Sequence, residues 1–138
     1  MAQKAGTEPL VANSRAFPSD VETFIAYCID SVEQVEVLLL LSSTRERGWT
    51  MNEISAHLRS SVRSVGLRLG SLVAHGLVRR DGMTFQYAAS ESDDRLVQRL
   101  AQVYAERKSA VIDRIFNLGD PMRSFANAFR LREQETDG

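Results

Sequence analysis

Apolar positions recur at the spacing of a helix in two segments near the start of the chain. The first predicts a helix that Ser19 or Asp20 caps and that continues to about Ile29, where Asp30-Ser31 interrupts the pattern. Ser31 and Gln34 form a capping-box pattern for a second helix, expected over about 32–45. The shared face of the first helix consists of Phe24, Tyr27 and Cys28. The apolar residues of the second suggest a helix in the centre of the core: Val35, Leu38, Leu39 and Leu41.

Two further helices are expected between residues 50 and 75. Thr50 and Glu53 form a second capping box, which predicts a short helix over about 51–58. A polar turn follows, and Ser60 or Ser61 caps a longer helix that ends near His75. The expected apolar stripe of that longer helix consists of Val62, Val65, Leu69, Leu72 and Val73.

Two strand-like runs come next. Gly76 lies where a helix end favours a left-handed residue. The runs 77–80 and 83–88 flank Asp81-Gly82, a dipeptide typical of a two-residue hairpin turn. The sequence therefore predicts a single β-hairpin after the second of the two helices.

A long helix is expected over about 92–117, because an acidic start at 90–94 suits the positive end of a helix dipole. Gly119 ends it, and Asp120-Pro121 begins another helix. The apolar face of the long helix is Leu96, Leu100, Val103, Val111, Ile112, Ile115 and Phe116. The last helix carries Met122, Phe125, Ala126 and Phe129 on one face. These faces suggest a homodimer held by the C-terminal helices.

The fold class expected is mostly α with a small β-hairpin. It is a winged helix-turn-helix with helical extensions on both sides. Residues 1–18 are expected to be a disordered tail and 133–138 a frayed one. The winged helix-turn-helix domain with its leading helices is expected over 19–89, and a C-terminal helical dimerisation extension over 90–132.

The block from Thr50 to Ala88 resembles winged-helix transcriptional regulators of the MarR and ArsR kind. The resemblance covers under a third of the chain, and it is carried mainly by a recognition-helix end, Gly-Leu-Val and a basic strand. The residues that carry it are Leu69, Leu72, Val73, His75, Gly76, Leu77, Val78, Arg79 and Arg80. It implies that the helix after the turn and the hairpin meet double-stranded DNA.

Charge is distributed unevenly in a chain whose net charge is only −1. Residues 20–36 hold five acids and no base, whereas 59–80 hold five arginines and no acid. An arginine-rich, hydroxyl-rich face suits phosphates and guanine edges. The expected DNA-binding residues are Arg59, Ser60, Ser61, Arg63, Ser64, Leu67, Arg68, Ser71, Arg79 and Arg80.

Some residues depart from the regulators' pattern. Where the recognition helix of such regulators often carries Ser-Arg-His, this chain has Gly66, Leu67 and Arg68. Asp81 at the hairpin tip would repel phosphates. These departures favour an alternative, a winged-helix module that binds a partner protein through its acidic first helix or its C-terminal helices and does not bind DNA.

Other chemistry is not indicated. Cys28 is the single cysteine, and neither His57 nor His75 has further ligands at metal spacing, so we expect no metal and no cofactor. No nucleophile–base pair or phosphate-binding glycine loop occurs, which argues against an enzyme. Trp49 is expected to close the core between helix and hairpin. Without a signal sequence or a membrane span, a cytoplasmic protein is expected.

Overall fold

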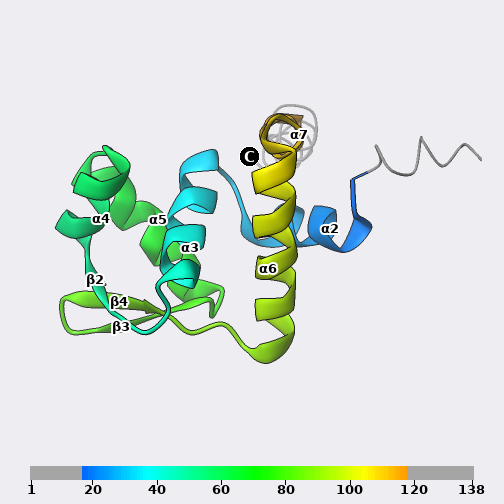
Figure 1. Ribbon diagram of the computed structural model, residues 1–138. Coiled ribbons are helices and arrows are strands. Elements are labelled where there is room, and N and C mark those ends of the chain that lie inside the picture. The colour runs from blue at the N-terminus through cyan, green and yellow to red at the C-terminus, as the bar shows by residue number, and fades with distance from the viewer. Residues whose placement is uncertain (1–16, 118–138) are drawn as a thin grey trace, which may run out of the picture.

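The computed structural model describes residues 17–117, which form six helices and a three-stranded sheet. The expected helix from residue 120 and the tails over 1–16 and 133–138 lie outside these residues. The division of the chain at residue 90 stays a prediction. The elements, in the order of Figure 1, are α2 (Ser19–Cys28), α3 (Val32–Ser43), β2 (Trp49–Thr50), α4 (Met51–Leu58), α5 (Val62–Ala74), β3 (Val78–Asp81), β4 (Thr84–Tyr87), α6 (Glu91–Glu106) and α7 (Lys108–Asn117).

The start of α2 differs from its expected form. Pro18 is the N-cap, and Phe17, expected in the disordered tail, is buried in the core. The guanidinium of Arg114 lies 5.0 Å from the centre of the Phe17 ring, so α7 covers it. The buried face of α2 is Val21, Phe24, Ile25 and Cys28. Tyr27, expected on that face, is 78% exposed, because the buried stripe turns away from it.

Buried Gln34 joins three elements. Ser31 caps α3 as expected, and its Oγ accepts a hydrogen bond from the Gln34 backbone N–H at 3.1 Å. The Gln34 side chain accepts from the backbone N–H of Asp30 rather than from Ser31. Its Nε2 donates to the Cys28 carbonyl at 3.1 Å and to Ser71 Oγ at 3.0 Å. One fully buried amide therefore fixes the end of α2 and the start of α3 against α5.

The hairpin belongs to a sheet of order β2-β4-β3, and all its pairs are antiparallel. Pairing of Trp49 with Phe85 adds β2, a strand that the sequence did not indicate. The two-residue loop is Gly82-Met83 rather than Asp81-Gly82, because Asp81 pairs with Thr84. Gly82 has a φ of 65°, which a glycine adopts without strain.

Trp49 closes the core as expected. Its side chain is buried, and its Nε1 donates to Thr44 Oγ1 at 2.8 Å. The His57 ring packs edge-on against the indole, with ring centres 5.5 Å apart. This gives His57 a packing role.

The prediction of a single long helix over 92–117 is wrong, because the structure has two helices there, α6 and α7. Its polar stretch at 106–109 contains a break at Arg107, whose φ of −140° and ψ of 57° are not helical. The break lets α7 change direction relative to α6 (Figure 1). The helix α7 then packs on the start of α2, where Arg114 pairs with Glu22 at 3.0 Å. Packing against α2 therefore decides the end of α6, a long-range effect that local periodicity does not contain.

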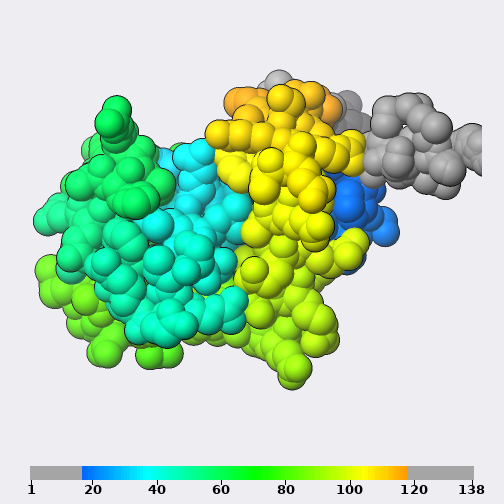
Figure 2. Space-filling model, in the orientation of Figure 1, coloured from blue at the N-terminus to red at the C-terminus, as the bar shows by residue number. Residues whose placement is uncertain are grey.

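The core is continuous from α2 to α7. Figure 2 shows α6, in yellow, lying against the cyan surface of α3, and Tyr104 of α6 donates to Glu36 at 2.9 Å. Much of the apolar surface that suggested a dimer is covered within the chain itself. The side chains of α6 and α7 that enter this core are Val97, Leu100, Val111 and Ile115.

Candidate nucleic-acid interface

The turn between α4 and α5 forms as the sequence predicts. The capping box of Thr50 and Glu53 begins α4, and Ser61 caps α5 by accepting from the Ser64 backbone N–H at 3.0 Å. Arg59 ends α4 in the left-handed conformation, with φ 59° and ψ 43°. A helix end commonly places glycine or asparagine there, so an arginine at this position is strained.

Gly76 ends α5 with a φ of 77°, and its geometry brings the hairpin beside the helix. The backbone N–H of Leu77 then bonds the Leu72 carbonyl at 3.0 Å. These local signals produce the arrangement expected from the sequence, in which α5 and the hairpin are neighbours.

The outer face of α5 is less polar than expected. Successive exposed positions carry Arg63, Leu67, Gly70 and Ala74, and the Leu67 side chain is 64% exposed. Val62 and Val73, expected in the buried stripe, are exposed as well. The buried stripe is narrower and consists of Val65, Leu69 and Leu72.

A second face of α5 is held by α3. Arg68 Nε donates to Glu33 Oε1 at 2.9 Å, and Ser64 donates to the same oxygen. Arg68 also lies 4.0 Å from the carboxylate of Asp30. Together with Ser71, which bonds Gln34, these predicted DNA-binding residues contact the chain itself.

The carboxyl group of Glu33 has a lowered pKa. Its burial acts to raise the pKa, but hydrogen bonds from Ser64, Ser60 and Arg68 to the ionised form outweigh that effect. Glu33 is therefore a charged anchor for α5.

The two hairpin arginines are exposed, and they donate hydrogen bonds only to uncharged acceptors. Arg79 donates to the Gln86 side chain at 3.1 Å. Arg80 donates to the Gly82 carbonyl at 3.0 Å, and its guanidinium lies 5.6 Å from the centre of the Phe85 ring. These contacts leave both positive charges uncompensated.

The acidic segment 20–36 and the arginine-rich segment 59–80 differ in how their charges are paired. Within residues 17–117, no ion pair joins Arg59, Arg63, Arg79 or Arg80 to an acid. Each acid of the 20–36 segment, in contrast, meets a partner in the chain. The pairs are Asp20–Arg99, Glu22–Arg114, Asp30–Arg68, Glu33–Arg68 and Glu36–Tyr104.

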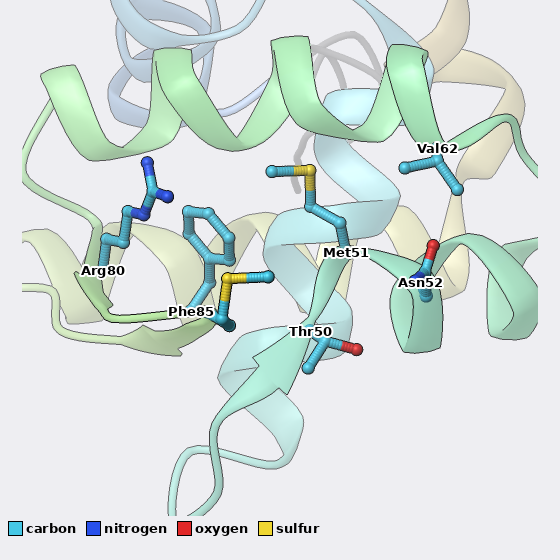
Figure 3. A pocket seen from close by; sticks show the side chains of 7 residues that line it. Thr50, Met51, Asn52, Val62, Arg80 and Phe85 are labelled. Carbon is cyan, nitrogen blue, oxygen red and sulfur yellow. The ribbon is translucent and has the colours of Figure 1, made fainter.

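A pocket of about 200 Å³ opens between the starts of α4 and α5 and the hairpin. Figure 3 shows Met51 and Phe85 pointing toward α5, with Arg80 on one side and Val62 on the other. Met83, at the hairpin tip, is 76% exposed. The sequence pattern gives no sign of this pocket, because the pocket depends on the pairing of β2 with β4. Its full lining is Thr50, Met51, Asn52, Val62, Arg80, Met83 and Phe85.

Among the described residues, no cluster of three potential metal ligands occurs. None of the helices in this part of the chain has the length and apolarity needed to cross a membrane.

Comparison with known proteins identifies similar folds. No family model and no curated protein matches the sequence. MepR of Staphylococcus aureus, a transcription regulator of the multidrug efflux pump MepA, is 17% identical with a TM-score of 0.50 over 91% of this chain and 95% of its own. The MarR family protein Rv2887 of Mycobacterium tuberculosis is 18% identical with a TM-score of 0.51 over 90% of each chain.

A complex of S. aureus MepR with DNA is also similar. Its identity is 15%, its TM-score is 0.50, and the match covers 94% of this chain and 92% of that chain. All three matches span nine-tenths of the chain or more, well beyond the block that carries the sequence resemblance. The chain therefore has the winged-helix fold of MarR-family transcription regulators.

Proposed function

We propose that this protein is a DNA-binding transcription regulator that acts as a homodimer and recognises specific sequences. The observation that carries the proposal is a set of exposed arginines at the end of α4, on α5 and on the hairpin: Arg59, Arg63, Arg79 and Arg80. These cations have no acid partner within residues 17–117, so a polyanion is their natural counterpart. The similarity to the MepR–DNA complex supports the same reading.

The residues of α5 have different proposed roles, which depend on their position along the helix. Ser61 and the first backbone N–H groups of α5 suit a phosphate, because a helix N-terminus attracts anions. Arg63, two residues after this N-cap and exposed on the outer face, suits a base edge. Arg68, Ser64 and Ser71 act through the contacts that fix α5 against α3, and we assign them a positioning role.

We also propose that the homodimer forms through the helices of residues 90–132. Phe116 of α7 is 58% exposed, and such a side chain is a natural interface residue. A two-fold dimer would present two α5 helices to successive half-sites of DNA. The cytoplasmic location expected from the sequence stays a prediction.

A second candidate function is a protein-interaction module. One observation favours it: exposed Val62 and Met83 line the pocket between α4, α5 and the hairpin, and α5 carries two further exposed apolar side chains, Leu67 and Val73. The acidic α2, in contrast, pairs its carboxylates with α6 and α7, which leaves less of its charge for a partner.

The deciding experiment is selection of duplexes from a random DNA library, followed by titration of the selected duplex at several salt concentrations. We expect log affinity to fall linearly with log salt, by roughly 0.9 per neutralised phosphate. Arg63→Ala should weaken specific binding by about 1–3 kcal/mol and relax specificity at one position. The matched control is Arg95→Ala, an exposed arginine on α6. Failure to enrich any duplex, or a flat salt response, would support the interaction module instead.

A further inference from the structure

The outer face of α5 carries an exposed leucine that does not serve the fold. Leu67 is 64% exposed. The buried face of α5, which packs on the core, is formed by Val65 and Leu69 on either side of it in sequence. Leucine stabilises a protein by leaving water, so a leucine held in water contributes little here. A single exposed leucine is common on protein surfaces, so the case for a contact with another molecule rests on Leu67 together with its neighbours on this face of α5.

Gly70 provides a second, independent observation. It lies one turn after Leu67 on the same face, and a Cβ built there meets nothing within 4 Å. Glycine in a helix interior is less stable than alanine, and neither a positive φ nor a close neighbour within residues 17–117 requires it. A position without a side chain does, however, let another molecule approach the backbone closely.

We infer that Leu67 is a specificity-determining residue that packs on the C5-methyl group of a thymine in the DNA major groove. The inference rests on the proposed function and adds to it the identity of one base. The thymine methyl is the apolar group that a base pair presents in the major groove, and apolar side chains read it by contact. Gly70 then lets α5 lie deep enough for that contact.

The position of the thymine follows from helix geometry. Arg63 and Leu67 are four residues apart, which corresponds to about 6 Å along a helix axis. Base pairs are spaced by about 3.4 Å, so the thymine lies within roughly two base-pair steps of the base that Arg63 contacts. Arginine favours guanine, and the recognised sequence therefore combines a guanine with a nearby thymine.

The charge around Leu67 favours DNA over an apolar peptide as its occupant. Arg63 precedes it on the same face, and Arg59 precedes α5 itself; neither has an acid partner within the described residues. An uncharged apolar segment would leave these cations uncompensated, whereas the phosphates beside a major groove complement them.

The test replaces each thymine of a duplex selected by the wild-type protein with deoxyuridine, which removes only the methyl group. We expect one thymine whose replacement weakens wild-type binding about three- to tenfold, as the loss of one buried methyl predicts. Leu67→Ala should weaken binding by a similar factor and become insensitive to deoxyuridine at that same position. Val73→Ala, another exposed apolar residue of α5, is the matched control and should keep the wild-type sensitivity.

The outcomes separate the inference from the function on which it rests. If the protein enriches a duplex but no thymine replacement matters, the Leu67 inference is wrong and DNA binding stands. The same conclusion follows if Leu67→Ala stays as sensitive to deoxyuridine as the wild type. If no duplex is enriched, both fail. Thermal melting checks that Leu67→Ala is folded, and an exposed position predicts an unchanged melting temperature.

Discussion

The Nε atom of Arg68 lies 2.9 Å from Oε1 of Glu33, and this ion pair joins α5 to the first turn of α3. Both side chains are more than two-thirds buried, so water screens the pair less than it screens an exposed one. Ser64 donates to the same carboxylate oxygen, and Gln34 reaches Ser71 one turn further along α5. The acidic segment of the sequence thus fixes the orientation of the helix proposed to enter DNA.

This relationship predicts different results for two arginines of the same helix. Arg68→Ala leaves the Glu33 carboxylate without its cation and should lower the free energy of unfolding by about 1–3 kcal/mol. Arg63→Ala removes an exposed side chain and should change it by less than about 0.5 kcal/mol. Urea denaturation of both variants measures the difference. Equal stabilities would contradict the assignment of Arg68 as a positioning residue.

The same anchor predicts how stability depends on pH. The folded-state pKa of Glu33 lies below its ordinary value of 4.5, because hydrogen bonds from Ser64, Ser60 and Arg68 outweigh the effect of burial. The contribution of Glu33 is therefore fully present above the unfolded value and is lost as pH falls through the folded value. Denaturation of wild type and Glu33→Gln between about pH 7 and pH 3 should give stabilities that converge toward the acid end. Parallel pH profiles would show that the carboxylate is not an anchor.

Much of the local structure is predictable because its signals are local. The start of α4 depends on Thr50 and Glu53, and the start of α5 on Ser61, all within one turn of the helix they cap. Gly76 fixes the end of α5 through its own backbone preference. Such signals require no knowledge of the rest of the fold.

The remainder depends on contacts between distant segments. Spacing alone assigned Val62 and Val73 to the buried stripe, but the width of that stripe depends on which elements cover α5. Arg68 is neutralised only because the start of α3 lies beside it, and Glu33 is 35 residues away in sequence. The missed strand β2 is two residues long, too short to show an alternating pattern. The candidate site was therefore predictable as a surface, but the pairing of its individual residues was not.

Arg59 offers a test of whether strain is retained for function. Arg59 has a left-handed backbone conformation, which costs a residue with a Cβ about 1–2 kcal/mol of folding free energy. Glycine adopts this conformation without that cost. Arg59→Gly should raise the free energy of unfolding by roughly 0.5–1 kcal/mol, because the greater entropy of glycine in the unfolded chain offsets only part of the relieved strain. DNA affinity should fall, with a salt slope smaller by about 0.9, if Arg59 contacts a phosphate. Arg59→Lys is the control that keeps charge and strain. A glycine variant that is more stable and binds equally well would remove Arg59 from the interface.

Two glycines with opposite surroundings predict opposite effects of the same substitution. A Cβ at Gly70 meets open space, so Gly70→Ala should stabilise the helix by about 0.5–1 kcal/mol. A Cβ at Gly48 lies 3.0 Å from Thr84 Cβ and Oγ1, so Gly48→Ala should destabilise by about 1–3 kcal/mol. Thermal melting measures both. The added methyl group at Gly70 should also weaken DNA binding, and unchanged binding would contradict a close approach of DNA to this face.

Assembly of the proposed dimer depends on the surface that α6 and α7 leave exposed. Because α6 and α7 bury Leu100 and Ile115 against this chain's own core, the dimer we propose must use the residues that remain exposed. Phe116, 58% exposed on α7, is the large apolar side chain of that kind on the two helices within residues 17–117. Light scattering of the full chain should show a dimer at micromolar concentration. Phe116→Glu should raise the dimer dissociation constant at least tenfold, a cost of about 1.4 kcal/mol.

Met83→Gln is the matched control, because Met83 is at least as exposed but lies at the hairpin tip, far from α7 along the chain. It should leave the dimer intact. Both variants should melt near the wild-type temperature, since neither position contributes to the core. A wild-type chain that is monomeric at micromolar concentration would defeat the dimer and the two-half-site model with it. A dimer indifferent to Phe116→Glu would move the interface to another surface of the chain.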